Sequence, residues 1–143
     1  MTRQTMRSVA VGAALFAAGF VVRDAMPAAP VVQAQGTKVF ELRTYTSPEG
    51  KLPNLQARFR DHTRRIFDKH GMRSIGYWVP QDTPNTLIYI ISHDSREQAK
   101  QNWAAFGKDP EWQKVAQESQ VDGKIVAKVD SVFMTATDYS AIK

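Results

Sequence analysis

Three polar side chains alternate along a segment near residue 40 that has the pattern of a strand. Glu41, Arg43 and Tyr45 lie two residues apart, so an extended chain projects them from one face. Phe40 and Leu42 project from the opposite face. Arginine offers a fork of donors that suits a carboxylate or another anion, and tyrosine adds a hydroxyl. If Phe40 and Leu42 pack on helices, the polar side chains face a barrel interior and line a ligand-binding pocket.

The same spacing also fits a structural role for this pair of charges. An unpaired buried charge costs several kcal/mol, so Arg43 and Glu41 could instead form an internal salt bridge. The sequence leaves both interpretations open.

His62 is the candidate catalytic residue. Apolar residues recur at helical spacing from Leu52 to His70, and His62 falls in the same stripe as Phe59 and Ile66. Histidine titrates near neutrality and serves acid–base catalysis, although a histidine in such a stripe also fits a core position.

Trp78 is the aromatic residue that we expect to line a ligand cavity. It shares a strand face with Ser74 and Gly76, and the missing side chain of Gly76 leaves room beside the indole. The other aromatic residues are expected mainly to pack in the core.

The sequence predicts no metal site and no cofactor. The chain has no cysteine, and His70 lies eight residues after His62, about 12 Å along a helix axis, which is too far to share one metal ion. His93 has no ligand partner nearby in the sequence. Motifs for a phosphate-binding loop, a nucleophile elbow and a dinucleotide site are all missing from the sequence.

The elements that would hold these residues alternate as β-α-β-β-α-β. This order predicts an α+β, ferredoxin-like fold with an antiparallel sheet and its helices on one face. We expect Asp94 to cap the second helix, with Glu97 three residues on, and Asp109 and Pro110 to start a further short helix. The expected ranges are strands 37–46, 74–79, 86–92 and 124–137 and helices 52–70 and 94–107. The further short helix is expected to start at residue 109, with Trp112, Val115 and Ala116 on its buried side.

The predicted sheet is apolar on both faces. In the third strand Leu87, Tyr89 and Ile91 point one way, whereas Ile88 and Ile90 point the other. An antiparallel sheet with one face in water should alternate apolar with polar residues. Since helices cover one face only, we expect a second copy of the chain to cover the other, in a homodimer that forms a dimeric α/β barrel.

The N-terminus reads as a signal peptide over residues 1–34. Arg3 and Arg7 precede an apolar run at residues 8–22, and cleavage would fall between Ala34 and Gln35. The run has about 15 residues, fewer than the roughly 20 of a membrane-spanning helix. The pattern predicts an exported protein, periplasmic or secreted; the alternative is a membrane anchor formed by the uncleaved residues 8–22.

The charge of the chain gives no sign of nucleic-acid binding. Its net charge is +5, and removal of residues 1–34 takes away three basic residues and one acidic residue, which leaves +3. Basic and acidic residues are interleaved along the first helix, which is typical of a solvated helix face.

A set of short motifs that covers residues 39–140 resembles the NIPSNAP family. In chain order they are Phe40-Glu41-Leu42-Arg43-Thr44-Tyr45, Gly50, Leu52, Phe59, His62, Lys69-His70-Gly71-Met72, Ile75-Gly76, Trp78, Asn85, Tyr89, Trp103, Ala105-Phe106, Asp109-Pro110-Glu111-Trp112 and Thr137-Asp138-Tyr139-Ser140. The resemblance implies a dimeric, ferredoxin-like domain over residues 37–140. It implies no reaction, and the partners of the family's mitochondrial members are not expected for an exported chain.

Three functions compete on this sequence. The first is binding of a small, partly apolar ligand in a barrel or cleft pocket. The second is a cofactor-independent enzyme, such as a monooxygenase or isomerase, with His62 as the acid–base group and Arg43 and Tyr45 orienting the substrate. The third is a protein-interaction module that acts through the outer helices. We expect ligand binding; an enzyme would need an open pocket that contains His62 or Tyr45.

Overall fold

The computed structural model describes residues 38–143. The predicted signal peptide at 1–34, the alternative anchor at 8–22 and the cleavage site between Ala34 and Gln35 lie outside the described residues.

The described chain has the predicted order of strands and helices. The elements are β1 (Val39–Thr46), α1 (Leu52–Arg58), the π-helix η1 (Phe59–Thr63), α2 (Arg64–Lys69), β2 (Arg73–Trp78), β3 (Thr86–His93), α3 (Arg96–Lys108), α4 (Pro110–Glu118) and β4 (Lys128–Thr135). β4 starts later than expected because the chain first places Ile125 in the core, where Ser47 Oγ donates to the Ile125 carbonyl at 2.9 Å.

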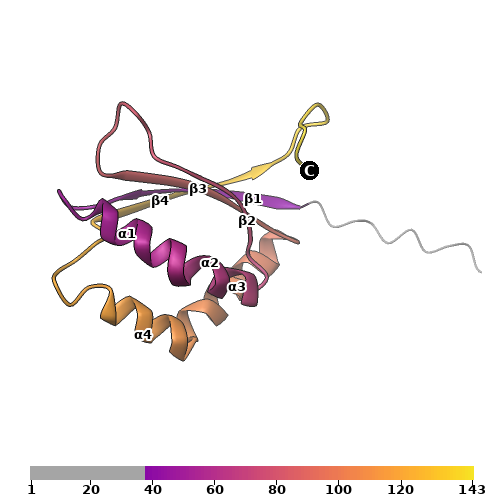
Figure 1. Cartoon of the computed structure of the whole chain (residues 1–143). Coiled ribbons are helices and arrows are strands. Elements are labelled where there is room, and N and C mark those ends of the chain that lie inside the picture. Colours follow the sequence, from indigo (N-terminus) through magenta and orange to yellow (C-terminus); the bar gives the residue numbers. More distant parts are fainter. Residues whose placement is uncertain (1–37) are drawn as a thin grey trace, which may run out of the picture. The chain divides into compact units, whose positions relative to one another are not determined.

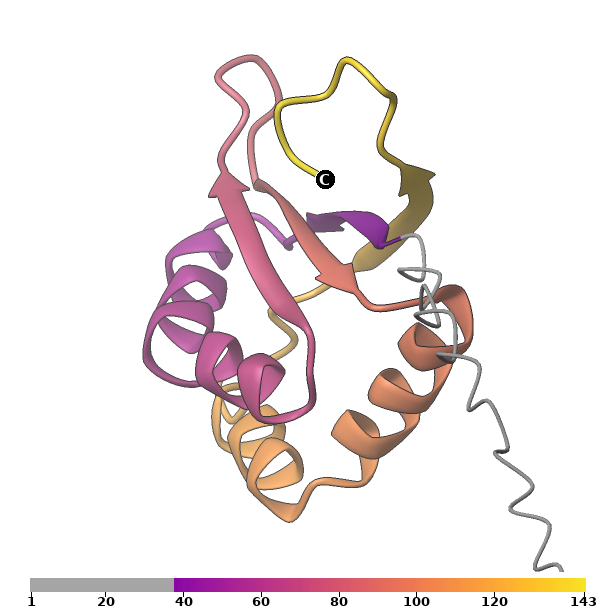
Figure 2. The same ribbon diagram turned by 90° about the vertical axis from the view of Figure 1, so that its right-hand side faces the viewer.

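The four strands form one antiparallel sheet in the order β2-β3-β1-β4. All the helices lie on one face of this sheet (Figure 1), and the turned view shows the α1–α2 segment beside α3 and α4 on that face (Figure 2). The fold is therefore the expected ferredoxin-like α+β arrangement.

The core lies between the sheet and the helices. Leu55, Ile66 and Phe67 from the first helical segment pack against Tyr89 and Ile91 of β3. The segment ends at Lys69, and the chain then turns at Gly71, whose φ of +71° lies in the left-handed region that favours glycine. Burial of these apolar side chains is what fixes the helices on the sheet.

The π-helix changes which residues of the first helical segment face the core. The amide of Arg64 donates to the Phe59 carbonyl five residues earlier, so one extra residue is enclosed in that turn. As a result Thr63 is buried and His62 is exposed. The prediction that His62 lies in the apolar stripe is wrong, because the wider turn carries it away from the core.

Ser95, not Asp94, caps α3. The Ser95 side chain accepts from the amide of Gln98 at 3.0 Å, and the helix then runs past Gly107 to Lys108. The expected start of α4 is confirmed: Asp109 accepts from the amide of Glu111 at 2.8 Å, and Pro110 is the first helical residue.

The face of the sheet opposite the helices, which we call the open face, is mainly apolar. Val132 is 55% exposed and Trp78 is 51% exposed, while Leu42, Ile88 and Ile90 are partly exposed. The C-terminal segment 135–142 turns back over one end of this face and lines a 310 Å³ apolar pocket with Phe40, Ile75, Ile90 and Met134. The chain itself therefore covers one end of the face that we expected a second copy to cover, and the rest of this face stays uncovered.

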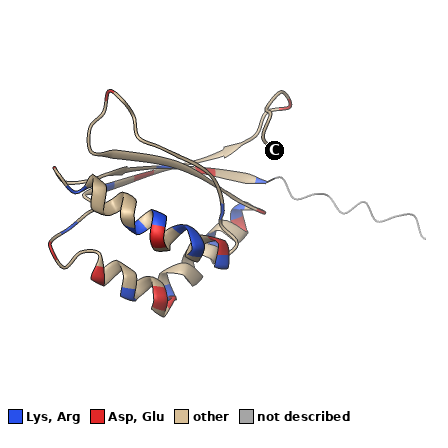
Figure 3. Ribbon diagram, in the orientation of Figure 1, with Lys and Arg blue, Asp and Glu red and all other residues tan. Residues whose placement is uncertain are grey.

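Charged residues gather on the helices, and the strands carry few (Figure 3). One network joins the end of α2 to the start of α4: Asp109 accepts from Lys69 and His70, both at 2.7 Å, and Arg65 pairs with Glu111. Within residues 38–143, no helix combines the length and the apolar character that a membrane span requires.

Candidate ligand-binding site

Glu41 is the centre of a buried hydrogen-bond cluster between the sheet and α3. Each of its carboxylate oxygens accepts from two side chains, so its acceptor capacity is filled by the protein itself. The donors are Arg43 Nη1 at 2.7 Å and Ser131 Oγ at 2.7 Å on one oxygen, and Trp103 Nε1 at 2.7 Å and His93 Nε2 at 3.1 Å on the other.

Glu41, Arg43 and Tyr45 face the helices, so the condition under which they would line a barrel interior, that Phe40 and Leu42 pack on the helices, does not hold. Phe40 and Leu42 lie on the open face instead. The physical reason is that a buried carboxylate needs donors: Trp103 of α3 and His93 of β3 supply them only on the helix side. The salt bridge considered as the alternative is present, at 2.7 Å.

The surroundings of this cluster shift the pKa values of its members. Burial raises the pKa of the Glu41 carboxyl, but the hydrogen bonds from His93, Ser131, Trp103 and Arg43 outweigh it and bring the pKa down to about 2. Burial lowers the pKa of Arg43, while the nearby phenols of Tyr45 and Tyr89 and the Glu41 carboxylate raise it by more. Both groups are therefore charged at neutral pH.

Tyr45 packs in the aromatic core rather than in a pocket. Its ring lies 5.8 Å from Phe59 and 5.3 Å from Tyr89, centroid to centroid, and the Arg43 guanidinium lies 5.6 Å from the Tyr45 ring and 4.2 Å from the Trp103 ring. Arg43 and Tyr45 are thus neighbours, as predicted, but their partners come from their own chain.

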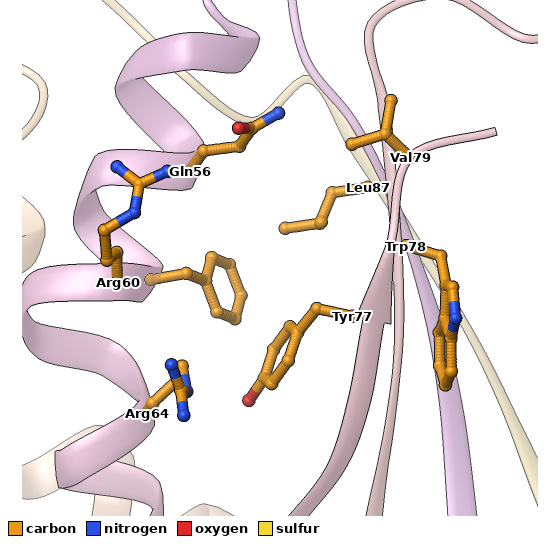
Figure 4. Close-up of a pocket in the computed structure, with 8 residues that line it drawn as sticks. Gln56, Arg60, Arg64, Tyr77, Trp78, Val79 and Leu87 are labelled. Atoms are coloured by element: carbon orange, nitrogen blue, oxygen red, sulfur yellow. The ribbon is translucent and has the colours of Figure 1, made fainter. Parts of the chain in front are cut away.

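A cleft opens between the first helical segment and β2 (Figure 4). Its volume is about 220 Å³. Phe59 and Leu87, each 4% exposed, form its apolar floor, and Tyr77 projects into it from β2. The Tyr77 ring is held in place by a 2.8 Å hydrogen bond between its hydroxyl and Ser74 Oγ.

The helix side of this cleft is basic. Gln56, Arg60 and Arg64 line it, and the Arg64 guanidinium lies 5.7 Å from the centre of the Tyr77 ring. Among the residues that the structure describes, neither arginine forms a salt bridge, and no acidic side chain lines the cleft. The cleft therefore combines an apolar floor with two positive charges at its rim.

Trp78 borders the cleft through its backbone end, and its indole lies on the other side of β2 from Tyr77 (Figure 4). The ring covers Gly76, and any side chain at this position would overlap the Cη2 and Cζ2 atoms of the indole. The space beside Gly76 that suggested a cavity is occupied by the indole itself.

His62 lines a second depression, the groove between α1–η1 and α4. The groove has a volume of about 310 Å³, and Arg58 and Ser119 also line it. Neither Arg43 nor Tyr45 lines this groove, so the structure does not bring the predicted acid–base residue together with the predicted substrate-orienting residues.

Of the residues that line the cleft, sequence reasoning named Trp78 as a cavity residue and missed Arg60, Arg64 and Tyr77. Arg60 and Arg64 were expected to belong to a solvated helix face. Arg60 directly follows Phe59, which marks the edge of the core, and this is the signal that could have found it. Tyr77 was among the aromatic residues expected mainly to pack in the core.

The chain matches the model of the family described as NIPSNAP over residues 40–141. It belongs to the NIPSNAP family. This confirms the resemblance seen in the sequence, and the ferredoxin-like fold agrees with solved NIPSNAP structures. No curated protein matches the chain.

Two solved NIPSNAP structures resemble this chain over nearly their whole length. A NIPSNAP family protein with unknown function from Agrobacterium tumefaciens is 20% identical, with a TM-score of 0.66, covering 76% of this chain and 96% of that one. An uncharacterized NIPSNAP-like domain protein from Burkholderia xenovorans is 17% identical, with a TM-score of 0.65, covering 73% and 90%.

The fold is also shared outside the NIPSNAP family. SnoaB, a cofactor-independent oxygenase from Streptomyces nogalater, is 14% identical with a TM-score of 0.52, covering 75% of this chain and 99% of that one. At this identity the likeness concerns the fold alone. Within residues 38–143, no group of three or more histidine, aspartate or glutamate side chains could hold a metal ion.

Proposed function

We propose that this NIPSNAP protein binds a small, partly apolar anion in the cleft between η1 and β2. The observation that carries the proposal is the pair of arginines, Arg60 and Arg64, at the rim of a cleft whose floor is apolar and buried. An arginine fork pairs with a carboxylate through two parallel hydrogen bonds, so the head of such a ligand would lie at the rim.

The floor of the cleft favours an aromatic or short aliphatic tail. The ring centroids of Phe59 and Tyr77 are 5.7 Å apart in an edge-to-face arrangement, and Leu87 completes the apolar surface. Burial of apolar ligand surface contributes roughly 25 cal/mol per Å², whereas the arginines give orientation and specificity. A ligand without the negative charge would keep only the first of these contributions.

The test compares 3-phenylpropionate with its alcohol, 3-phenylpropanol, by titration calorimetry. The double variant Arg60→Gln/Arg64→Gln should bind the acid at least tenfold more weakly and the alcohol as the unmodified protein does. Arg73→Gln is the matched control, because Arg73 is also exposed and lies outside the cleft. Equal losses for acid and alcohol, or the same loss in the control, would refute the proposal.

We further propose that the protein is an exported homodimer in which a second copy covers the open face. The support is the apolar surface left by the helices and the C-terminal segment, including Val132 and Trp78, together with the N-terminal pattern at residues 1–34. A membrane is a partner only if residues 8–22 are retained as an anchor.

The alternative function is a cofactor-independent enzyme with His62 as its acid–base group. His62 is exposed in an open groove, which such an enzyme requires. Arg43 and Tyr45 could not orient a substrate there, because they lie in the core. This separation is why ligand binding is the better-supported function.

A further inference from the structure

Arg58 carries a buried charge that no carboxylate of the described chain neutralises. The residue is 6% exposed, its Nε has no hydrogen-bond partner, and its Nη1 makes one long contact, 3.4 Å from Ser119 Oγ. No salt bridge of the described residues includes it. An unpaired buried charge is costly, so this guanidinium is suited to receive a negative group from outside the chain.

The neighbours of Arg58 do not compensate its charge. Its guanidinium lies 5.2 Å from the centre of the Trp112 ring, and the side chains of Tyr45 and Tyr89 lie near it. Burial accordingly lowers the pKa of Arg58. Arg43, by contrast, forms a salt bridge with Glu41 at 2.7 Å.

Arg58 is reached from the groove that it lines, and the mouth of this groove is acidic. Asp61, Glu118 and Asp122 all line the groove and are all exposed, while Arg58 lies inside. Glu118 has only a 3.9 Å contact with the exposed Lys114 to offset its charge. The groove thus has a buried positive charge and an outer negative rim.

We propose that this groove binds a small zwitterion of the α-amino acid type, with its carboxylate on Arg58 and its ammonium group at the acidic rim. A simple anion would be repelled by the rim, and a simple cation would be repelled by Arg58. A zwitterion satisfies both, and its side chain would contact the apolar residues Ala57, Val115 and Val121 that share the groove. The volume of about 310 Å³ admits a molecule of this size.

Leucine and its two halves test this proposal. Titration calorimetry at pH 7 would compare leucine with 4-methylpentanoate, which lacks the ammonium group, and with 3-methylbutylamine, which lacks the carboxylate. Leucine should bind at least tenfold more tightly than either. Absence of saturable leucine binding, or equal binding of 4-methylpentanoate, would overturn the proposal.

Variants test which residues bind the carboxylate of leucine and which bind its ammonium group. Arg58→Gln should abolish binding of leucine. Because a buried substitution can prevent folding, the exposed double variant Asp61→Asn/Glu118→Gln gives a second test. This variant should bind leucine at least tenfold more weakly and 4-methylpentanoate more tightly than the unmodified protein does. The control Asp68→Asn/Glu97→Gln removes two exposed acids outside the groove and should change neither; a matching loss in this control would contradict the assignment.

This site is independent of the cleft between η1 and β2. The Arg60→Gln/Arg64→Gln variant should bind leucine normally, and the acidic-rim variant should bind 3-phenylpropionate normally. Each proposal can therefore fail alone.

Discussion

At the scale of single residues, Glu41 unites four parts of the fold. Its donors come from β1, β3, β4 and α3, so the carboxylate joins the sheet to the second half of the helical layer. His93 is held in turn, since Asn102 Nδ2 lies 3.4 Å from His93 Nδ1 and 3.3 Å from the Gly71 carbonyl. Removal of the carboxylate would leave several buried donors unpaired, which is expensive.

Glu41 makes the stability of the protein fall in acid. Its pKa is about 2 in the folded protein and 4.5 in its ordinary state, so the stability it contributes is complete above about pH 4.5 and is lost as pH falls toward 2. Urea unfolding should show this decline over that interval. In Glu41→Gln the decline should be shallower. The free energy of unfolding at pH 7 should be lower by roughly 3–5 kcal/mol, as when one partner of a buried ion pair is removed.

The exposed Glu49 provides the control for this measurement. Glu49→Gln should change the stability at pH 7 by less than about 0.5 kcal/mol and leave the acid profile as it is. If Glu41→Gln gave the same acid profile as the unmodified protein, Glu41 would not be its cause.

The Glu41–Arg43 pair could be predicted from the sequence, but the rest of its cluster could not. The two residues are adjacent on one strand face, so their pairing is a local matter. His93, Trp103 and Ser131 are 52, 62 and 90 residues away from Glu41, and only the assembled fold brings them there. The same long separation explains why the sequence left open which face of this strand meets the helices.

At the scale of elements, two adjacent residues, Asp94 and Ser95, are candidates for the N-cap of α3, and variants of each test which one caps it. Ser95→Ala should destabilise the protein by about 1 kcal/mol, because the amide of Gln98 loses its acceptor. Asp94→Ala should have a much smaller effect, since Asp94 is exposed and does not cap the helix. Thermal unfolding of the two variants measures the difference, and a larger loss in Asp94→Ala would contradict the assignment.

The first helical segment shows what periodicity predicts and what it misses. Its extent and its core residues Leu55, Phe59 and Ile66 follow from a spacing of 3.6 residues. The π-turn does not, because no residue type marks it, and one extra residue per turn rotates His62 outward. The site was therefore predicted less well than the fold: Arg58 and Arg60 differ in burial only through their position on this helix.

At the scale of the whole molecule, the apolar open face should determine whether the protein is a monomer or a dimer in solution. Sedimentation velocity at micromolar concentration should show two copies for the unmodified protein and one copy for Val132→Asp. Val129→Asp is the matched control: Val129 is 40% exposed on the same strand but on the opposite face. An unmodified protein that sediments as a single copy would refute the dimer.

Trp78 gives this molecule a built-in optical reporter. Its indole lies over Gly76 on the open face and is half exposed, whereas Trp103 and Trp112 are packed against the core cluster. Tryptophan emission moves to shorter wavelength when water is withdrawn from the ring. In the proposed dimer, dilution would separate the two copies and shift the emission of Trp78 to longer wavelength. Coverage of the sheet could then be monitored without a label, at concentrations too low for the centrifuge.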